Sequence, residues 1–92
     1  MTRTSAIDRV STYFDSGHFA EELRDLVAYE TESQTPTKAA ELTRYLEAAM
    51  VPRLSEMGFA CEIHPNPVQG AGPLLVAERL EGEALPTILS YG

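Results

Sequence analysis

The chain has 92 residues, a length that allows one domain with a thin hydrophobic core. Its 14 acidic residues outnumber its 7 basic ones, and Lys and Arg form no basic patch, so we do not expect a nucleic-acid partner. We also expect neither a membrane span nor secretion, because the sequence contains no apolar run of about 18 residues and no signal segment. The single cysteine, Cys61, forms no internal disulfide, which favours the reducing cytoplasm.

Two short helices are predicted near the N-terminus. The first begins after Ser5, with Asp8 as the partner residue of a capping box, and ends within residues 15–17. One face of this helix carries Ile7, Val10 and Phe14. The second helix begins near Phe19, and its apolar residues have the spacing of a helix packed on a core: Phe19, Leu23, Leu26 and Val27.

A third, longer helix is predicted from Pro36 to Met57, after a loop over residues 31–36. Thr35 is the expected N-cap, and Gly58 is the expected terminator. Pro52 lies inside this helix and removes one backbone hydrogen bond. We therefore expect a kink or a break near residues 48–49.

Three strands follow in the prediction. Residues 59–64 alternate between apolar and more polar positions, and a loop over residues 65–73 leads to a second strand at 74–79. The third strand runs from Thr87 to Tyr91 and, like the second, is apolar on both faces, which is typical of a strand inside a sheet with two covering layers. The predicted fold class is therefore α/β, with three helices followed by three strands and the helices packed on a mixed sheet. We expect such a sheet to need more chain than these residues supply.

No residue is predicted to be catalytic, cofactor-binding or metal-ligating. Cys61 and His64 are three apart, which places them on opposite faces of a strand, and His18 is expected at the surface. The acidic residues Glu21, Glu22 and Asp25 match the dipole of a helix start. Residues 70–72 are glycine-rich but precede a strand, so a mobile loop is expected there instead of a phosphate site, and Ser90 lacks the glycine of a nucleophile elbow.

Four blocks of the chain resemble the start of a known family, that of the two-zinc aminoacylases, acetylornithine deacetylases, succinyl-diaminopimelate desuccinylases and carboxypeptidases. The blocks are residues 29–36 (YETESQTP), 54–59 (LSEMGF), 73–79 (PLLVAER) and 86–92 (PTILSYG). In that family a histidine, any residue and an aspartate follow the Tyr-Gly strand end, and they supply the first metal ligand and a bridging carboxylate. The sequence ends at Gly92, so no ligand can be assigned to it.

The resemblance implies that residues 1–92 are the N-terminal part of a metal-binding catalytic domain of a zinc-exopeptidase type, without the rest of that domain or the lid domain. The parent protein would be a hydrolase, a metallopeptidase or other amidohydrolase, that cleaves a peptide or N-acyl amide bond. It would use two zinc ions, or cobalt or manganese, to activate a bridging water. These 92 residues alone would hold no metal and would be inactive.

The alternative is a complete small acidic α/β module that binds or self-assembles and has no enzymatic activity. An unpaired apolar strand edge recruits other chains. We therefore expect self-association through the edge of the strand from Thr87 to Tyr91 in either case.

Overall fold

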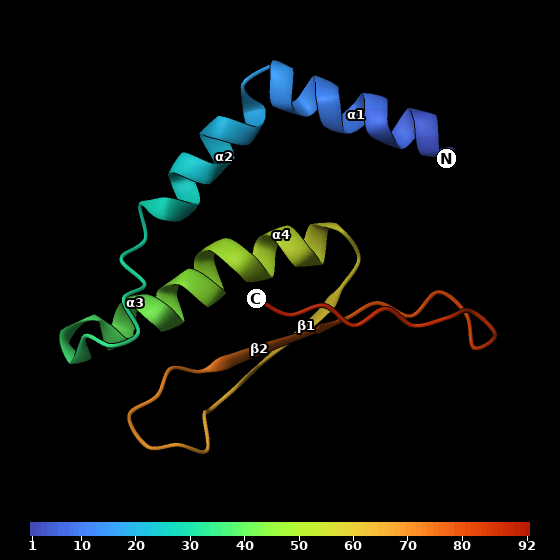
Figure 1. Cartoon of the computed structure of the whole chain (residues 1–92). Coiled ribbons are helices and arrows are strands. Elements are labelled where there is room, and N and C mark those ends of the chain that lie inside the picture. The colour runs from blue at the N-terminus through green and yellow to red at the C-terminus, as the bar shows by residue number, and fades with distance from the viewer.

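The structure, a computed structural model, describes all of residues 1–92 and belongs to the mixed α/β class (Figure 1). Two helices open the chain, followed by a long helical stretch and a hairpin of two strands. In chain order these elements are α1 (Arg3–Asp15), α2 (His18–Val27), η1 (Pro36–Lys38), α3 (Ala39–Arg44), η2 (Tyr45–Met50), α4 (Val51–Glu56), β1 (Ala60–His64) and β2 (Leu74–Glu78). None of the helices has both the length and the apolar character needed to cross a membrane.

Helix α1 begins three residues earlier than predicted, and the predicted capping box of Ser5 and Asp8 is wrong. Thr2 is the N-cap, and its hydroxyl accepts a hydrogen bond from the backbone N–H of Ser5 at 3.1 Å. The Ser5 hydroxyl oxygen accepts in return from the N–H of Thr2 at 3.0 Å. Two hydroxyl side chains therefore satisfy two backbone donors at the helix start, and the capping box contains no acidic residue.

The two N-terminal helices form an arm (residues 3–27) that stands apart from the rest of the chain (Figure 1). Gly17 joins them with a φ of 87°, a left-handed conformation that glycine adopts without strain. The prediction that α2 packs on a core is wrong, because Phe19, Leu23 and Val27 are all exposed. The helical spacing of these residues is as predicted, but no other element covers their face.

The long helical stretch runs from Pro36 to Glu56 and confirms the prediction of a third helix interrupted ahead of Pro52. The interruption takes the form of a π-helical segment, η2, in which the N–H of Val51 reaches back five residues to the carbonyl of Leu46. Pro52 has no N–H to donate to the carbonyl one turn before it. A widened turn lets the helix pass this position without ending.

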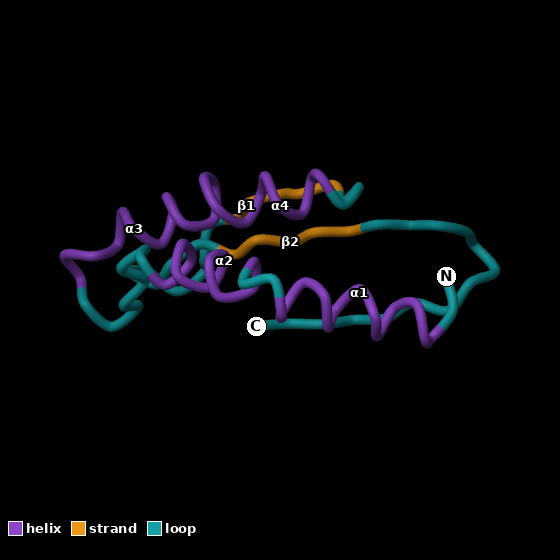
Figure 2. Tube along the Cα trace, turned by 90° about the horizontal axis from the view of Figure 1, so that it is seen from above, coloured by secondary structure: helices purple, strands orange, loops and turns teal.

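Strands β1 and β2 form an antiparallel hairpin in which Ala60 pairs with Glu78 and His64 pairs with Leu74. The alternation predicted for the first strand is confirmed. One face of the hairpin is half-buried and the other is exposed. Helix α4 packs against β1, and Ala49, at the end of the π-helical segment, is the one fully buried residue. Figure 2 shows the helical stretch and the hairpin side by side.

The predicted third strand is absent, and the sheet is not mixed. The C-terminal segment (residues 85–92) is extended but unpaired (Figure 2), and the last backbone hydrogen bond of the chain joins the N–H of Leu85 to the carbonyl of Gly82. Ile88 and Leu89 are each 91% exposed. β-branched and apolar residues favour a strand only when a neighbouring strand accepts their backbone hydrogen bonds, and here none does.

The chain is less compact than a domain of its size. Its accessible surface is 7911 Å², whereas a compact monomer of 10.1 kDa exposes about 5,300 Å². Its radius of gyration is 16.1 Å, compared with about 12 Å for a compact domain of this length. About 2,600 Å² of surface that a compact fold would bury is therefore exposed.

Candidate functional site

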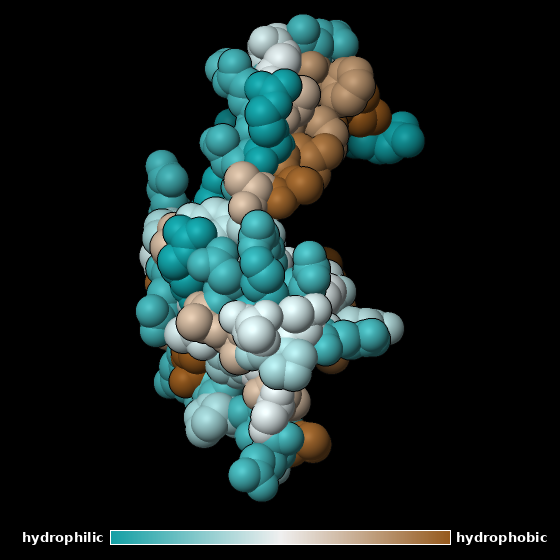
Figure 3. All heavy atoms as spheres, turned by 90° about the vertical axis from the view of Figure 1, so that its left-hand side faces the viewer, coloured by the Kyte–Doolittle hydropathy of each residue, from teal (hydrophilic) through white to brown (hydrophobic).

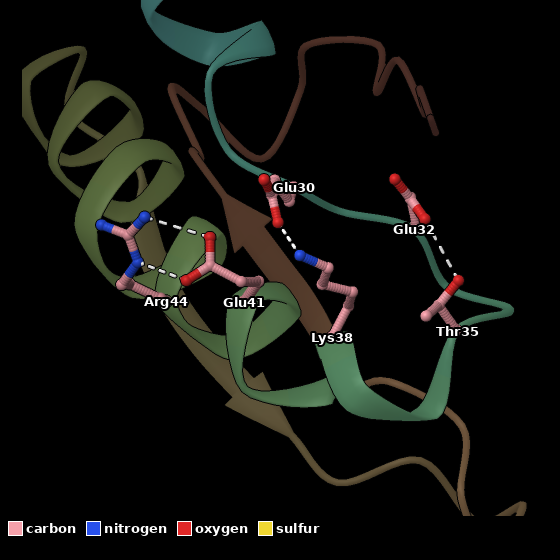
Figure 4. Close-up of polar contacts among 6 residues, drawn as sticks. All are labelled: Glu30, Glu32, Thr35, Lys38, Glu41 and Arg44. Atoms are coloured by element: carbon pink, nitrogen blue, oxygen red, sulfur yellow. Dashed lines mark hydrogen bonds and ion pairs between the residues drawn. The ribbon is translucent and has the colours of Figure 1, made fainter.

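A cluster of polar contacts lies where the loop after α2 meets the start of the long helical stretch (Figure 4). Lys38 forms an ion pair with Glu30 across this loop. The hydroxyl of Thr35 donates a hydrogen bond to Oε2 of Glu32 at 3.1 Å. Both contacts join residues of the loop to residues at or just before the helix start, so they fix the path of residues 30–35.

Tyr29, at the beginning of this loop, is held by an aromatic and a cationic side chain. The Tyr45 ring meets the Tyr29 ring edge to face at 5.6 Å between centroids, and the guanidinium carbon of Arg44 lies 4.6 Å from the centre of the Tyr29 ring. Tyr29 and Tyr45 therefore pack on each other. The cation–π contact of Arg44 adds to this attachment.

Arg44 also forms a bidentate ion pair with Glu41 (Figure 4). Its Nε donates to Oε1 of Glu41 at 2.8 Å, and its Nη2 donates to Oε2 at 3.0 Å. The hydrogen bond from Arg44 holds the pKa of the Glu41 carboxyl below its usual value and raises the pKa of the guanidinium. Glu41 is therefore a charged partner of Arg44 at neutral pH and is poorly suited to act as a general base.

No three His, Cys, Asp or Glu side chains converge in a way that could hold a metal ion. In the polar cluster each carboxylate contacts one neighbouring side chain. Glu30 forms an ion pair with Lys38, Glu32 accepts a hydrogen bond from Thr35, and Glu41 forms an ion pair with Arg44. These contacts hold residues 29–38 in one conformation against the long helical stretch.

His18 lies at the corner between α1 and α2, where Ser16 is its polar neighbour. The Ser16 hydroxyl oxygen is 2.9 Å from Nδ1 of His18 and donates to the carbonyl of Tyr13 at 3.0 Å. Either the Ser16 hydroxyl or Nδ1 of His18 can donate this hydrogen bond, depending on the tautomer of the imidazole. His18 makes no other hydrogen bond, so no third residue orients its imidazole as in a nucleophile–base pair.

An open hollow of about 440 Å³ surrounds this corner, and His18 is exposed there as predicted. The hollow is lined by Asp8, Arg9, Thr12, Tyr13, Ser16 and His18. Sequence reasoning missed the contact between Ser16 and His18. The sequence pattern that could have indicated this contact is a serine two residues before a histidine, with the turn-forming Gly17 between them.

Cys61 and His64 lie on opposite faces of β1, which confirms the prediction from their spacing. The Cys61 thiol faces the helical stretch and lies 3.8 Å from the hydroxyl oxygen of Ser55. On the exposed face, Nε2 of His64 is 3.2 Å from Oε2 of Glu62. These residues therefore cannot share a metal ion.

The glycine-rich residues 70–72 belong to the loop between β1 and β2, where Gly72 lies next to Leu42 of α3. The Asn66 side chain donates to the carbonyl of Gly72 at 3.1 Å and accepts from the N–H of Val68 at 2.8 Å. A Cβ atom at Gly72 would lie 2.7 Å from Cδ1 of Leu42. Glycine is thus favoured here by a close approach to the end of the Leu42 side chain.

The C-terminal segment carries Ser90 at an exposed position without a polar partner. Before this segment, Arg79 is fixed by two contacts: its Nη1 donates to the carbonyl of Met57 at 3.0 Å, and its Nη2 lies 2.6 Å from Oε1 of Glu81. A shallow hollow of about 300 Å³ lies here, between Phe59 and Ile88. The turn that sends the segment back along the hairpin is thereby tied to the end of α4.

Comparisons of the chain with protein-family models, with curated proteins and with solved structures found no match in any of the three.

Proposed function

We propose that the chain is an N-terminal scaffold of a metal-dependent hydrolase that cleaves peptide or N-acyl amide bonds, an exopeptidase, dipeptidase or deacylase. The observation that carries this proposal is the occurrence, in order, of the four sequence blocks that resemble the two-zinc aminoacylase and carboxypeptidase family. On the lone thiol of Cys61 we place this hydrolase in the cytoplasm.

The positions of the four blocks support the proposal. Residues 29–36 form the loop that is fixed to the long helix (Figure 4), and residues 54–59 form the turn from α4 into β1. The third block is β2 with its flanking residues, and the fourth lies in the C-terminal segment. Each block thus lies at a junction or on a strand that sets the direction of the chain, as expected of a scaffold that positions a site.

The donor groups of this chain do not fit the two zinc ions that the resemblance implies, because no three potential ligands converge. We therefore place the ligands and the general base of the proposed hydrolase outside residues 1–92. Within this proposal the C-terminal segment leads toward the metal centre.

Metal-binding and activity measurements on the isolated chain test whether the metal ligands and the general base lie outside residues 1–92. Purified chain is dialysed against zinc, and its retained metal is measured by mass spectrometry, with hydrolysis of dipeptides and N-acetyl amino acids followed in parallel. The proposal predicts that no stoichiometric zinc is retained and that no substrate is hydrolysed. Tight retention of two zinc ions, or hydrolysis that a chelator abolishes, would contradict it.

A second candidate function is a self-assembling binding module, the alternative that requires no further chain. The observation that favours it is the exposure of Ile88, Leu89 and Tyr91, the last of them 97% exposed. Unpaired extended segments of this kind add to the edge of another sheet. An Ile88→Asp substitution on the apolar segment would prevent this assembly, whereas Glu83→Gln before it would not, as measured by light scattering.

A further inference from the structure

Arg79, the residue that follows β2, connects three parts of the chain. Its Nη1 donates to the carbonyl of Met57 at the end of α4 at 3.0 Å, although the two residues are 22 positions apart. Its Nη2 lies 2.6 Å from Oε1 of Glu81, in the turn after β2. A planar guanidinium holds two acceptors in a fixed geometry, so this one side chain joins the end of the helix, the end of the strand and the turn.

The carbonyl of Met57 has no other partner in the chain. The helix ends at the left-handed Gly58, with a φ of 89°, and the N–H of Phe59 donates to the carbonyl of Leu54 at 3.0 Å. This hydrogen bond belongs to the Schellman motif, which satisfies a carbonyl one turn before the helix end. No backbone N–H donates to the Met57 carbonyl itself. Arg79 therefore supplies that hydrogen bond and places positive charge at the negative end of the helix dipole.

The turn over residues 80–84 reverses the chain between β2 and the C-terminal segment. It has two attachments: the N–H of Leu85 donates to the carbonyl of Gly82 at 3.2 Å, and the Glu81 carboxylate contacts Arg79. No backbone hydrogen bond holds the chain beyond Leu85. The direction in which the C-terminal segment leaves the turn therefore depends on how the turn is fixed to the rest of the chain.

Three of the four blocks that carry the family resemblance meet at this side chain. Met57 belongs to the block at residues 54–59, and Arg79 is the last residue of the block at 73–79. Residues 86–88 of the fourth block line a shallow hollow together with Arg79. The contacts of Arg79 thus fix the relative placement of the parts that the proposed function treats as the scaffold.

The arm contributes nothing to this placement. Figure 3 shows hydrophobic side chains left uncovered along one side of the arm. No backbone hydrogen bond and no ion pair joins residues 3–27 to residues 85–92. We propose that Arg79 is a positioning residue, which fixes the turn over residues 80–84 to the end of α4 and so sets the direction of the C-terminal segment. This inference rests on the proposed function, in which that segment leads to a catalytic site beyond residue 92.

The direction of the segment can be measured in the chain itself. In a Cys61→Ser background, Glu47→Cys on the helical stretch and Ser90→Cys on the segment carry two nitroxide labels, and double electron–electron resonance gives the distribution of distances between them. Arg79→Ala should widen this distribution at least about twofold, because a turn that loses its attachments opens at little cost in free energy. Glu83→Gln, in the same turn and without an ion pair, should leave the width unchanged.

A second variant keeps the test decisive if Arg79→Ala unfolds the hairpin, which amide exchange in β1 and β2 reports. Glu81→Gln weakens the contact with the turn and leaves the hydrogen bond to Met57 in place. It should widen the distribution, by less than Arg79→Ala does. An unchanged width in Glu81→Gln and Arg79→Ala, or an equal widening by Glu83→Gln, would overturn the proposal.

The full-length protein read from the source gene tests the consequence for catalysis. Arg79→Ala should lower kcat at least about tenfold per folded molecule at an unchanged KM, because small displacements of a reacting group cost large factors in rate. Arg79→Lys should recover part of this loss, since lysine keeps the charge but lacks the planar fork. A full-length protein that hydrolyses no peptide or N-acyl amide would contradict the proposed function. An active protein whose kcat is the same in Arg79→Ala would overturn only the role of Arg79.

Discussion

Arg53 on α4 lies next to Glu22 on α2, with 3.6 Å between Nε and Oε1, and this is the one ion pair that joins the arm to the rest of the chain. The Nη1 atom of Arg53 donates to the carbonyl of Ala49 at 2.9 Å, which holds the guanidinium in place. Nε itself is buried and makes no hydrogen bond, so Glu22 is its compensating charge. A single ion pair thus joins the arm to the rest of the chain, and it is a long contact between partly exposed side chains.

The first prediction concerns that contact. Replacing Glu22 by Gln should speed hydrogen exchange of the α2 amides and leave exchange in α4 and the hairpin unchanged. The free energy of unfolding should fall by less than about 1 kcal/mol, because solvent screens a partly exposed pair. Glu21→Gln, one residue away and without an ion pair, is the control. Equal exchange in the two variants would show that Arg53 does not fix the arm.

The second prediction concerns the close approach of Gly72 to Leu42. Gly72→Ala should lower the free energy of unfolding by up to about 1 kcal/mol, because the new Cβ would lie 2.7 Å from Cδ1 of Leu42 and the end of that side chain would have to move. Leu42→Ala removes the obstructing atoms. In a double-mutant cycle by urea denaturation, the cost of Gly72→Ala should therefore disappear in the Leu42→Ala chain. Strict additivity would mean that the loop does not pack on α3 as described.

The third prediction concerns Pro52. Pro52→Ala restores a backbone N–H, so the π-helical turn can become a regular α-helical one and the chain should gain about 1–3 kcal/mol of stability. Pro36→Ala is the control, because Pro36 lies in the first turn, where no N–H partner is required. Thermal unfolding measures both. A loss of stability in Pro52→Ala would mean that the π-helical segment has a cause other than the proline.

The fourth prediction is a pH dependence of the loop attachment. The pKa of Glu41 is lowered by the hydrogen bond from Arg44, so the folded state binds this proton more weakly than the unfolded state. The stabilisation is present above the ordinary glutamate value of about 4.3 and is lost as the pH falls through the lowered pKa. The stability difference between the unaltered chain and Glu41→Gln should therefore vanish in strong acid. A difference that persists at low pH would exclude the Arg44 contact as its source.

Much of the local structure follows from the sequence. The helix over residues 36–56, its interruption ahead of Pro52 and the two faces of β1 depend on periodicity and on the missing N–H of proline, which neighbouring residues determine. The predictions of a third strand and of the packing of α2 on a core were wrong for one common reason. Both depend on a partner element, and apolar spacing identifies the face to be covered without showing what covers it.

The site could be predicted less well than the fold. The spacing of Cys61 and His64 correctly predicted that they lie on opposite faces of β1, because side chains alternate along a strand. The attachment of Tyr29 through Arg44 and Tyr45 depends on residues 15 or more positions apart, which a sequence pattern does not bring together. The role of Gly72 likewise depends on its distant neighbour Leu42.

The most direct test of the central claim is to read the source gene beyond the codon for Gly92. The proposed hydrolase scaffold predicts codons for histidine, any residue and aspartate, followed by a reading frame that supplies the remaining metal ligands. A stop codon directly after Gly92 would contradict the hydrolase and leave a self-associating module as the function of the chain.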